Sequence, residues 1–168
     1  DMAADRFGAD AVEDARDRLE DAASGLQDAV VRGAVRVASV AVDLARDGAE
    51  DLTDSRAMLI GAGEMGAATA RALMDSGVRE LVVVNRTIST ARALANLMGG
   101  EGVSFDSLAD ELAQADIVIS STDAPHTILN HADVETAMRT RPGRPMVLID
   151  IAVPRDIYDN PVNGFVAS

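Results

Sequence analysis

The feature that most constrains the fold is a short apolar run, residues 57–60, followed at once by glycines in the spacing G-x-G-x-x-G. In such a pattern Gly61 permits a tight turn from strand to helix, Gly63 lets a pyrophosphate approach the backbone, and Gly66 lets the helix pack on the strand. The N–H groups of the first helical turn have no partners within the helix, so they favour an anion. An ordinary turn can show the same spacing, so the choice between a dinucleotide-binding loop and a plain turn depends on the segments that follow. The predicted dinucleotide-binding residues of this loop are Gly61, Ala62, Gly63, Glu64, Met65 and Gly66.

Beyond this loop, apolar segments alternate with helical patterns. Continuous apolar strands separated by helices are typical of a parallel sheet covered on both faces and joined by right-handed crossovers. The sequence therefore predicts a doubly wound α/β fold of the Rossmann type, with ligands at the carboxyl ends of the strands. A polar connection at 51–55 separates this predicted domain, 55–168, from a helical segment, 1–50. The expected strands are 57–60, 81–84, 103–105, 117–119 and 146–149.

The helical segment shows two amphipathic patterns. Apolar residues recur at three- or four-residue spacing over 7–30 and again over 30–45, with possible breaks at Gly25 and Gly33. The second pattern has the broader apolar stripe, and we expect that stripe to be buried. Any part of the stripe left exposed would be an aggregation liability.

The charge balance excludes some functions. The chain has 28 acidic and 15 basic residues, a net charge of −13, and every basic residue is arginine. Such a surface repels phosphate backbones, so we expect no direct nucleic-acid binding by this segment. The acidity indicates a salt-rich cytoplasm, whereas a GC-rich genome explains the missing lysine equally well. No apolar run approaches the length of a membrane span and no signal peptide is evident, so we expect a soluble, cytoplasmic protein.

The residues after the second expected strand bear on cofactor choice. Proteins that bind NAD usually place Asp or Glu about 20 residues past the glycines, on the ribose 2′-hydroxyl. Here that position is occupied by Asn85, Arg86 and Thr87. Arginine can make paired, charge-assisted hydrogen bonds to a 2′-phosphate, so the loop predicts NADP rather than NAD. Turn formation and helix capping explain Asn85 and Thr87 but do not explain Arg86.

Polar residues also follow the fourth and fifth strands. Ser120, Ser121 and Thr122 stand where hydroxyls can bond the nicotinamide or its ribose, although such residues are also common turn formers. His126 is a candidate proton carrier, with an incidental loop histidine as the alternative. Arg155 can be a carboxylate clamp or part of a structural ion pair. His131 reads as a surface residue at a helix start, and we assign it no role.

Four motifs, in this order and spacing, resemble the NADPH-binding domain of the glutamyl-tRNA reductases, and a preceding helix beginning Arg32-Gly33-Ala34-Val35 resembles that family too. The resemblance covers roughly 31–156, and Asp123 stands where it leads us to expect a small residue. The glycine loop and the Asn-Arg-Thr loop are shared with shikimate dehydrogenases, while the last two motifs are more particular to the reductases. Val153 joins the predicted cofactor-binding residues. The four motifs are Gly61 to Gly66, Asn85 to Thr87, Ser120 to His126, and Asp150 to Asp156.

The resemblance implies a reaction in tetrapyrrole (porphyrin) biosynthesis, the reduction of glutamyl-tRNA to glutamate-1-semialdehyde. In that family a cysteine of an N-terminal domain forms a thioester, and NADPH supplies hydride. This chain has no cysteine. The resemblance therefore implies a fragment with no catalytic residue of its own, which binds NADPH and meets glutamyl-tRNA only through the missing catalytic domain. It also implies a homodimer for the full-length protein.

Two other interpretations stay open. A shikimate-dehydrogenase-like NADP oxidoreductase shares the first two motifs, and its substrate-binding Lys/Asp pair would lie mostly outside this domain. A non-catalytic module that binds NADP and regulates a partner would need only the cofactor loops. The segment from Asp150 to Asp156 favours the reductase.

Overall fold

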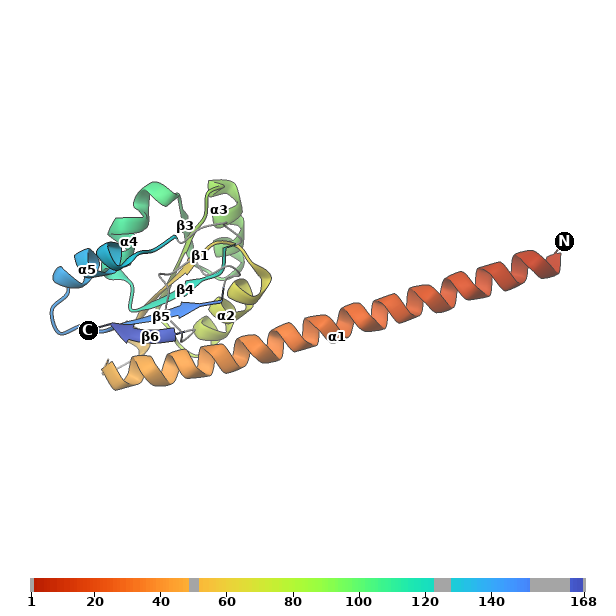
Figure 1. Ribbon diagram of the computed structural model, residues 1–168, viewed down its shortest axis with the longest axis horizontal. Coiled ribbons are helices and arrows are strands. Elements are labelled where there is room, and N and C mark those ends of the chain that lie inside the picture. Colours follow the sequence, from red (N-terminus) through yellow and green to blue (C-terminus); the bar gives the residue numbers. More distant parts are fainter. Residues whose placement is uncertain (1, 49–51, 123–127, 152–163, 168) are drawn as a thin grey trace.

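In the computed structural model, residues 2–48, 52–122, 128–151 and 164–167 are described, without the side chains of 2–9, 23, 26, 45–48 and 164–167. One long helix precedes an α/β domain (Figure 1). The helices are α1 (Met2–Gly48), α2 (Glu64–Asp75), α3 (Ile88–Leu97), α4 (Leu108–Gln114) and α5 (His131–Arg139), with short 3₁₀ turns at Leu52–Asp54 and Phe105–Ser107. The strands are β1 (Arg56–Ile60), β2 (Glu80–Val84), β3 (Glu101–Val103), β4 (Ile117–Ser120), β5 (Met146–Asp150) and β6 (Gly164–Ala167).

The strands form one sheet in the order β3-β2-β1-β4-β5-β6. The pairs from β3 to β5 are parallel, and β6 is antiparallel to β5. The predicted doubly wound parallel sheet is confirmed. The antiparallel edge strand β6 was not predicted. The third strand lies at Glu101–Val103 rather than at 103–105, because Phe105 already begins a 3₁₀ turn.

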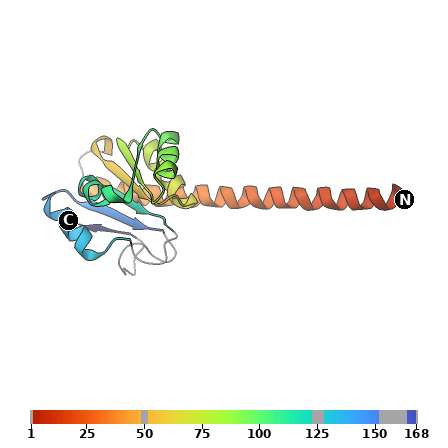
Figure 2. The ribbon, with the colours of Figure 1, turned by 90° about the horizontal axis from the view of Figure 1, so that it is seen from above.

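Alternate residues of β1, β2, β4 and β5 enter two separate cores, which explains the continuous apolar runs. On one face, Leu59 and Val83 pack with buried residues of α1, α2 and α3. On the other face, Met58 and Val82 pack with buried residues of α4 and α5. Figure 2 shows the helices on the two sides of the sheet.

The N-terminal segment is a single helix, not two. Gly25 and Gly33 lie within α1, so the predicted breaks are wrong. A helical glycine costs about 1 kcal/mol relative to alanine. At Gly33 a Cβ would lie 2.9 Å from Cε of Met65, the end of a flexible side chain that can shift, so the structure does not require glycine there.

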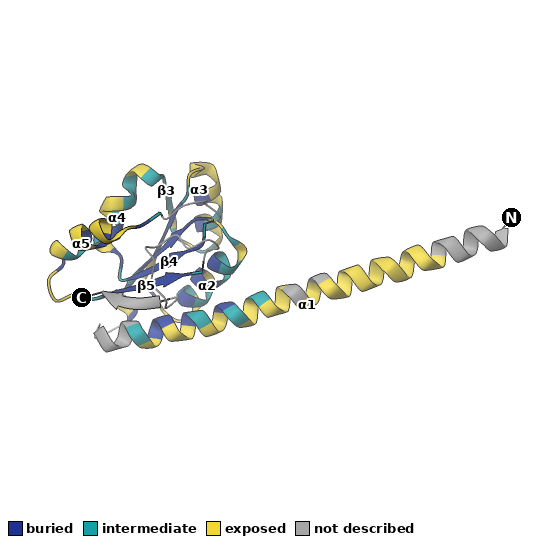
Figure 3. Cartoon of the chain, viewed as in Figure 1, coloured by how far each residue is buried: buried dark blue, intermediate teal, exposed yellow. Residues whose placement is uncertain are grey.

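The expected burial of the second apolar stripe is only partly right. Ala34, Ala38 and Ala41 are at most 2% exposed and belong to the core, whereas Val31 and Val35 are each 51% exposed. The N-terminal half of α1 is exposed wherever its side chains are described, and it projects away from the domain (Figure 3). Among the described residues, no helix has the length and apolar character needed to cross a membrane.

Candidate functional site

The sheet changes winding direction between β1 and β4. From β1 the chain proceeds through α2 to β2 and then β3, whereas β4 and β5 lie on the other side of β1. The carboxyl ends of β1 and β4 therefore border the crevice where ligands bind in this class of sheet. The predicted site residues that the structure describes follow β1, β2 and β4 at this edge.

The glycine loop begins with a strained turn that only glycine tolerates well. Gly61 has φ of +93°, and its N–H donates to the carbonyl of Val84 over 2.8 Å. The N–H of Ser121 donates to the carbonyl of Ile60 over 2.9 Å. A Cβ at Gly61 would lie 2.8 Å from the carbonyl oxygen of Ser121. The expected tight turn is thus present, and it is tied to the ends of both neighbouring strands.

Gly63 and Gly66 serve a second purpose that the sequence did not reveal. A Cβ at Gly66 would contact Cβ of Ser121, 2.5 Å from its Oγ, and would lie 3.0 Å from Cδ1 of Leu59. A Cβ at Gly63 would contact the same Oγ. The contact with Leu59 confirms that Gly66 lets α2 pack on β1. The two glycines also accommodate Ser121, which is 8% exposed.

The start of α2 follows directly from the glycine loop. Gly63 is the N-cap residue, with no side-chain capping bond, and Glu64 is the first residue of the helix. Ala62 and Glu64 are exposed, while Met65 is half-buried. An acidic residue in a first turn stabilises a helix dipole, so Glu64 has a structural explanation. The N–H groups of this turn remain available to an anion.

The loop after β2 contains Asn85, Arg86 and Thr87, and the Arg86 side chain has no partner among the described residues. The N–H of Asn85 donates to the carbonyl of Val103, and Nδ2 of Asn85 to the carbonyl of Thr87 over 3.4 Å. Thr87 is the N-cap residue of α3 but makes no side-chain capping bond. Arg86 is exposed and forms no ion pair or hydrogen bond with any residue in the described ranges. Among the described residues its guanidinium therefore has no competing partner for a ligand.

Buried polar residues end the next two strands. Ser120 is fully buried and pairs in register with Asp150, which is 7% exposed. The N–H of Ile151 donates to the carbonyl of Ser120 over 2.9 Å. Thr122 is half-buried next to Ser121. The predicted residues Asp123, His126, Val153 and Arg155 lie outside the described residues. His131 is the exposed first residue of α5, as expected.

The opposite edge of the sheet holds an ion-pair cluster that the sequence did not predict. The side chain of Arg141 is 1% exposed, and its Nη2 lies 2.7 Å from Oδ1 of Asp116. Arg144 reaches the same oxygen at 2.8 Å, and the N–H of Arg56 donates to the other carboxylate oxygen. Burial lowers the pKa of the Arg141 guanidinium, and Asp116 opposes that shift. These residues lie at the amino ends of the strands, away from the carboxyl edge where ligands bind. We therefore assign the cluster a structural role in stabilising the fold.

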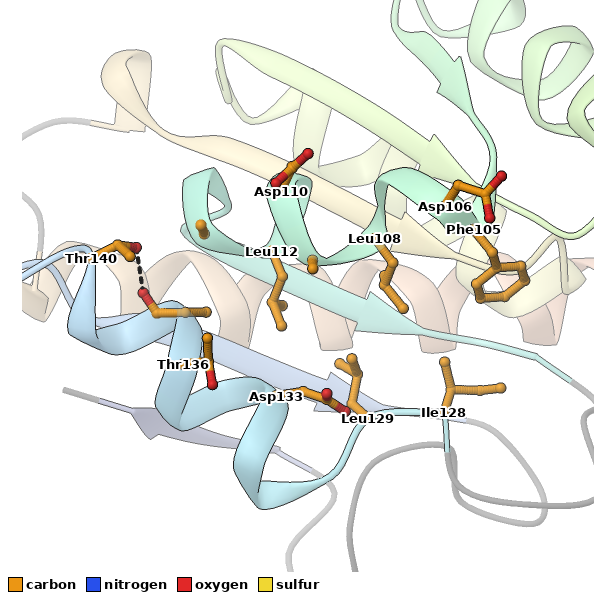
Figure 4. Close-up of a pocket in the computed structure, with 13 residues that line it drawn as sticks. Phe105, Asp106, Leu108, Asp110, Leu112, Ile128, Leu129, Asp133, Thr136 and Thr140 are labelled. Atoms are coloured by element: carbon orange, nitrogen blue, oxygen red, sulfur yellow. Dashed lines mark hydrogen bonds between the residues drawn. The ribbon is translucent and has the colours of Figure 1, made fainter.

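A groove of about 460 Å³ separates α4 from α5 (Figure 4). Its floor is apolar, with Leu108, Leu112 and Ile128 pointing into it, and Asp106 and Asp110 lie on its α4 side. None of the predicted cofactor-binding residues lines it. The groove is therefore separate from the glycine-loop site.

The fold and the carboxyl edge define a Rossmann-type nucleotide-binding domain. Residues 43–165 match the family model of the shikimate / quinate 5-dehydrogenases, and the chain belongs to that family. It is 48% identical over 135 residues to the glutamyl-tRNA reductase of Maridesulfovibrio salexigens, an alignment covering 80% of this chain and 30% of that protein. The glutamyl-tRNA reductase of Methanopyrus kandleri is 45% identical over 135 residues, covering 80% and 33%.

Solved structures show the same similarity to glutamyl-tRNA reductases. The Methanopyrus kandleri glutamyl-tRNA reductase superposes with a TM-score of 0.68 at 46% identity, covering 74% of this chain and 31% of that one. The nucleotide-binding domain of the Thermoplasma volcanium glutamyl-tRNA reductase superposes with a TM-score of 0.58 at 20% identity, covering 74% and 81%, and supports the fold alone. The chain spans about a third of the length of the curated relatives that it matches.

Proposed function

We propose that this chain is the NADPH-binding domain of a glutamyl-tRNA reductase, which reduces glutamyl-tRNA to glutamate-1-semialdehyde in tetrapyrrole (porphyrin) biosynthesis. The observation that carries the proposal is the identity of 45 to 48% with two such reductases over 80% of the chain. Residues 55–168 form the cofactor domain and residues 1–50 belong to a connecting helix.

The geometry at the carboxyl edge fits a dinucleotide. The turn at Gly61 exposes the start of α2, whose N–H groups would bind the pyrophosphate. Arg86 would bind the 2′-phosphate, because its guanidinium is exposed and uncommitted at the end of the strand next to β1. Ser120, Ser121 and Thr122 end β4 beside the glycine loop and would hold the nicotinamide half. Val153 completes the proposed cofactor-binding set.

The proposed division of labour follows from residue chemistry. The bound cofactor would supply hydride, and the protein would bind and orient it. A thioester requires a thiol, and the chain has none. The nucleophile and the tRNA-binding surface would therefore lie in other domains of a longer protein, which also supply its homodimer contacts. The net charge of −13 supports this arrangement, since it disfavours direct contact with tRNA.

We further propose that the protein works in a salt-rich cytoplasm. The support is the excess of 28 acidic over 15 basic residues and the absence of lysine. At high ionic strength, repulsion between exposed carboxylates is screened over a few ångströms.

The family model favours one alternative. Because it describes shikimate / quinate 5-dehydrogenases over residues 43–165, a shikimate-dehydrogenase-like NADP oxidoreductase is the second candidate. A longer gene product that oxidises shikimate and contains no thiol nucleophile would support it. A gene product that reduces glutamyl-tRNA through a cysteine would support the reductase. A product with neither activity that still binds NADPH would leave a regulatory module.

The cofactor assignment is tested by titrating NADPH and NADH against the chain at high salt and following nicotinamide fluorescence. The Arg86→Ala variant should bind NADPH about 10- to 100-fold more weakly than the wild type, because it loses charge-assisted hydrogen bonds to the 2′-phosphate. Its affinity for NADH, which lacks that phosphate, should be unchanged. Arg79→Ala is the matched control, because Arg79 is exposed just before β2, at the opposite end of the strand. Unchanged NADPH affinity in Arg86→Ala would exclude the 2′-phosphate assignment.

A further inference from the structure

The groove between α4 and α5 has an apolar floor that the core behind it only partly covers. Phe105, Leu108 and Ile128 are half-buried, because each packs against the core and also lines the groove. Figure 4 shows the side chains of Leu108 and Ile128 pointing into it. None of the proposed cofactor-binding residues lines the groove. An apolar hollow of about 460 Å³ outside the nucleotide site indicates a second binding surface.

The shape of the groove comes from small side chains beside large ones. Phe105, Leu108 and Leu112 are spaced by three and four residues, so they form one apolar row along α4 and the turn before it. Ala109 and Ala113 line the groove beside that row and add little bulk. From Phe105 to Ala113 the chain rises about 15 Å, at about 2.0 Å per residue in the 3₁₀ turn and about 1.5 Å per residue in α4. The groove therefore matches about three turns of a helix.

A helix is the backbone form that fits this surface. The described residues that line the groove belong to helices and to the segments before them, and no strand of the sheet is among them. An extended peptide would lay its backbone N–H and C=O groups on the apolar floor with no strand edge to pair with. A helix pairs those groups internally and presents large side chains three, four and seven residues apart to a groove.

The charged side chains around the groove all have the same sign. Asp106 and Asp110 lie on its α4 side, Asp133 comes from α5, and no arginine is among the described lining residues. The carboxylates of Asp106 and Asp110 are exposed and make no ion pair or hydrogen bond with another described residue. Acidic residues near the start of α4 also stabilise its dipole, but that role leaves both carboxylates accessible to a cationic partner.

We propose that the groove binds an amphipathic helix of a partner protein, with large aliphatic side chains on its buried face and arginine or lysine on both sides of that face. The aliphatic side chains would fill the floor and supply most of the affinity, and the basic side chains would reach the aspartates and select the partner. The same aspartates would repel the phosphates of nucleic acids and of anionic membranes. This surface is additional to the proposed cofactor site.

Fluorescence anisotropy without nucleotide tests the proposal. The probe is a labelled peptide of about 18 residues, long enough to form a helix, with leucine along one face and arginine on both flanks. A matched peptide carries glutamate in place of each arginine. The wild type should bind the arginine peptide with a micromolar Kd, at least about 10-fold more tightly than the glutamate peptide at about 0.1 M salt.

Charge reversal separates recognition from folding. The double variant Asp106→Arg with Asp110→Arg should bind the glutamate peptide more tightly than the arginine peptide, a reversal that loss of folding could not produce. Glu135→Arg is the matched control, because Glu135 is exposed on α5 and does not line the groove. This control should keep the preference of the wild type. A double variant that still prefers the arginine peptide would overturn the proposal.

A second pair of variants tests the apolar floor. Ala109→Leu should fill the groove from an exposed position and weaken binding of the arginine peptide at least about 10-fold. Ala132→Leu, at an exposed position of α5 outside the groove, should leave that affinity unchanged. Circular dichroism checks that all variants are folded.

Two other results would also overturn the proposal. One is a wild type that binds neither peptide. The other is self-association of the wild type in sedimentation that Ala109→Leu abolishes, because it would assign the groove to a second copy of the chain. These experiments contain no nucleotide, so their failure is distinct from a failure of the cofactor assignment.

Discussion

Replacing Gly66 with alanine isolates the contact between the glycine loop and the loop after β4. A Cβ at this position would contact Cβ of Ser121 and lie 2.5 Å from its Oγ. Overpacking of this kind costs about 1–3 kcal/mol. Alanine is also about 1 kcal/mol better than glycine inside a helix, and Gly66 lies in α2. Gly66→Ala should therefore lower the free energy of unfolding by roughly 0–2 kcal/mol.

The informative quantity is the coupling with Ser121. In a Ser121→Gly background the main obstacle is gone, so Gly66→Ala should now stabilise the chain by up to about 1 kcal/mol. The double-mutant cycle should give a coupling energy of about 1–3 kcal/mol. For a chain of this size, each kcal/mol corresponds to about 2–4 °C in the melting temperature.

The assay is urea unfolding of all four proteins without nucleotide, followed by circular dichroism. Any difference then reflects packing within the protein rather than cofactor binding. If Gly66→Ala changes stability equally in both backgrounds, or stabilises the chain that retains Ser121, the reasoning about this contact is refuted.

Two further predictions concern charge. Arg141→Met should lower the free energy of unfolding in urea by about 3–5 kcal/mol, because it leaves the largely buried Asp116 with fewer partners. Arg144→Ala should lower it by at most about 1 kcal/mol, because the Arg144 side chain is 56% exposed. Equal effects of the two substitutions would contradict the assigned roles. Raising NaCl from about 0.1 M to about 1 M, which shortens the Debye length from about 10 Å to about 3 Å, should raise the melting temperature of the chain, given its net charge of −13; a falling melting temperature would refute the salt-adaptation proposal.

Local sequence signals located most of the regular structure. The strand from Arg56 to Ile60 and the helix that begins at Glu64 follow from an apolar run and a glycine spacing that are both contiguous in the chain. Because the strands alternate with helices and no two strands are joined by a hairpin signal, the sequence predicts a parallel sheet. The edge strand Gly164–Ala167 was missed because it has only four residues and runs antiparallel to β5, so it does not belong to the alternation of parallel strands and helices.

The capping signal at α5 was also missed. Asn130 and Asp133 form a capping box, in which Asp133 N donates to Oδ1 of Asn130 over 3.0 Å and Asn130 N to Oδ2 of Asp133 over 2.9 Å. That pattern is local and could have been found. The Arg141–Asp116 cluster could not, because its members meet only when the amino ends of neighbouring strands are aligned.

By itself the sequence determined the winding of the sheet, the position of the glycine loop and the presence of arginine where a nucleotide-binding strand ends, because each depends on residues close together in the chain. The tertiary structure alone decided which neighbour requires Gly63 and Gly66 to lack side chains, since Ser121 arrives from a distant strand. It also decided that α1 is unbroken and that only its C-terminal half is covered, because burial depends on where the domain ends along the helix. Packing between distant segments, which local periodicity does not encode, accounts for both results.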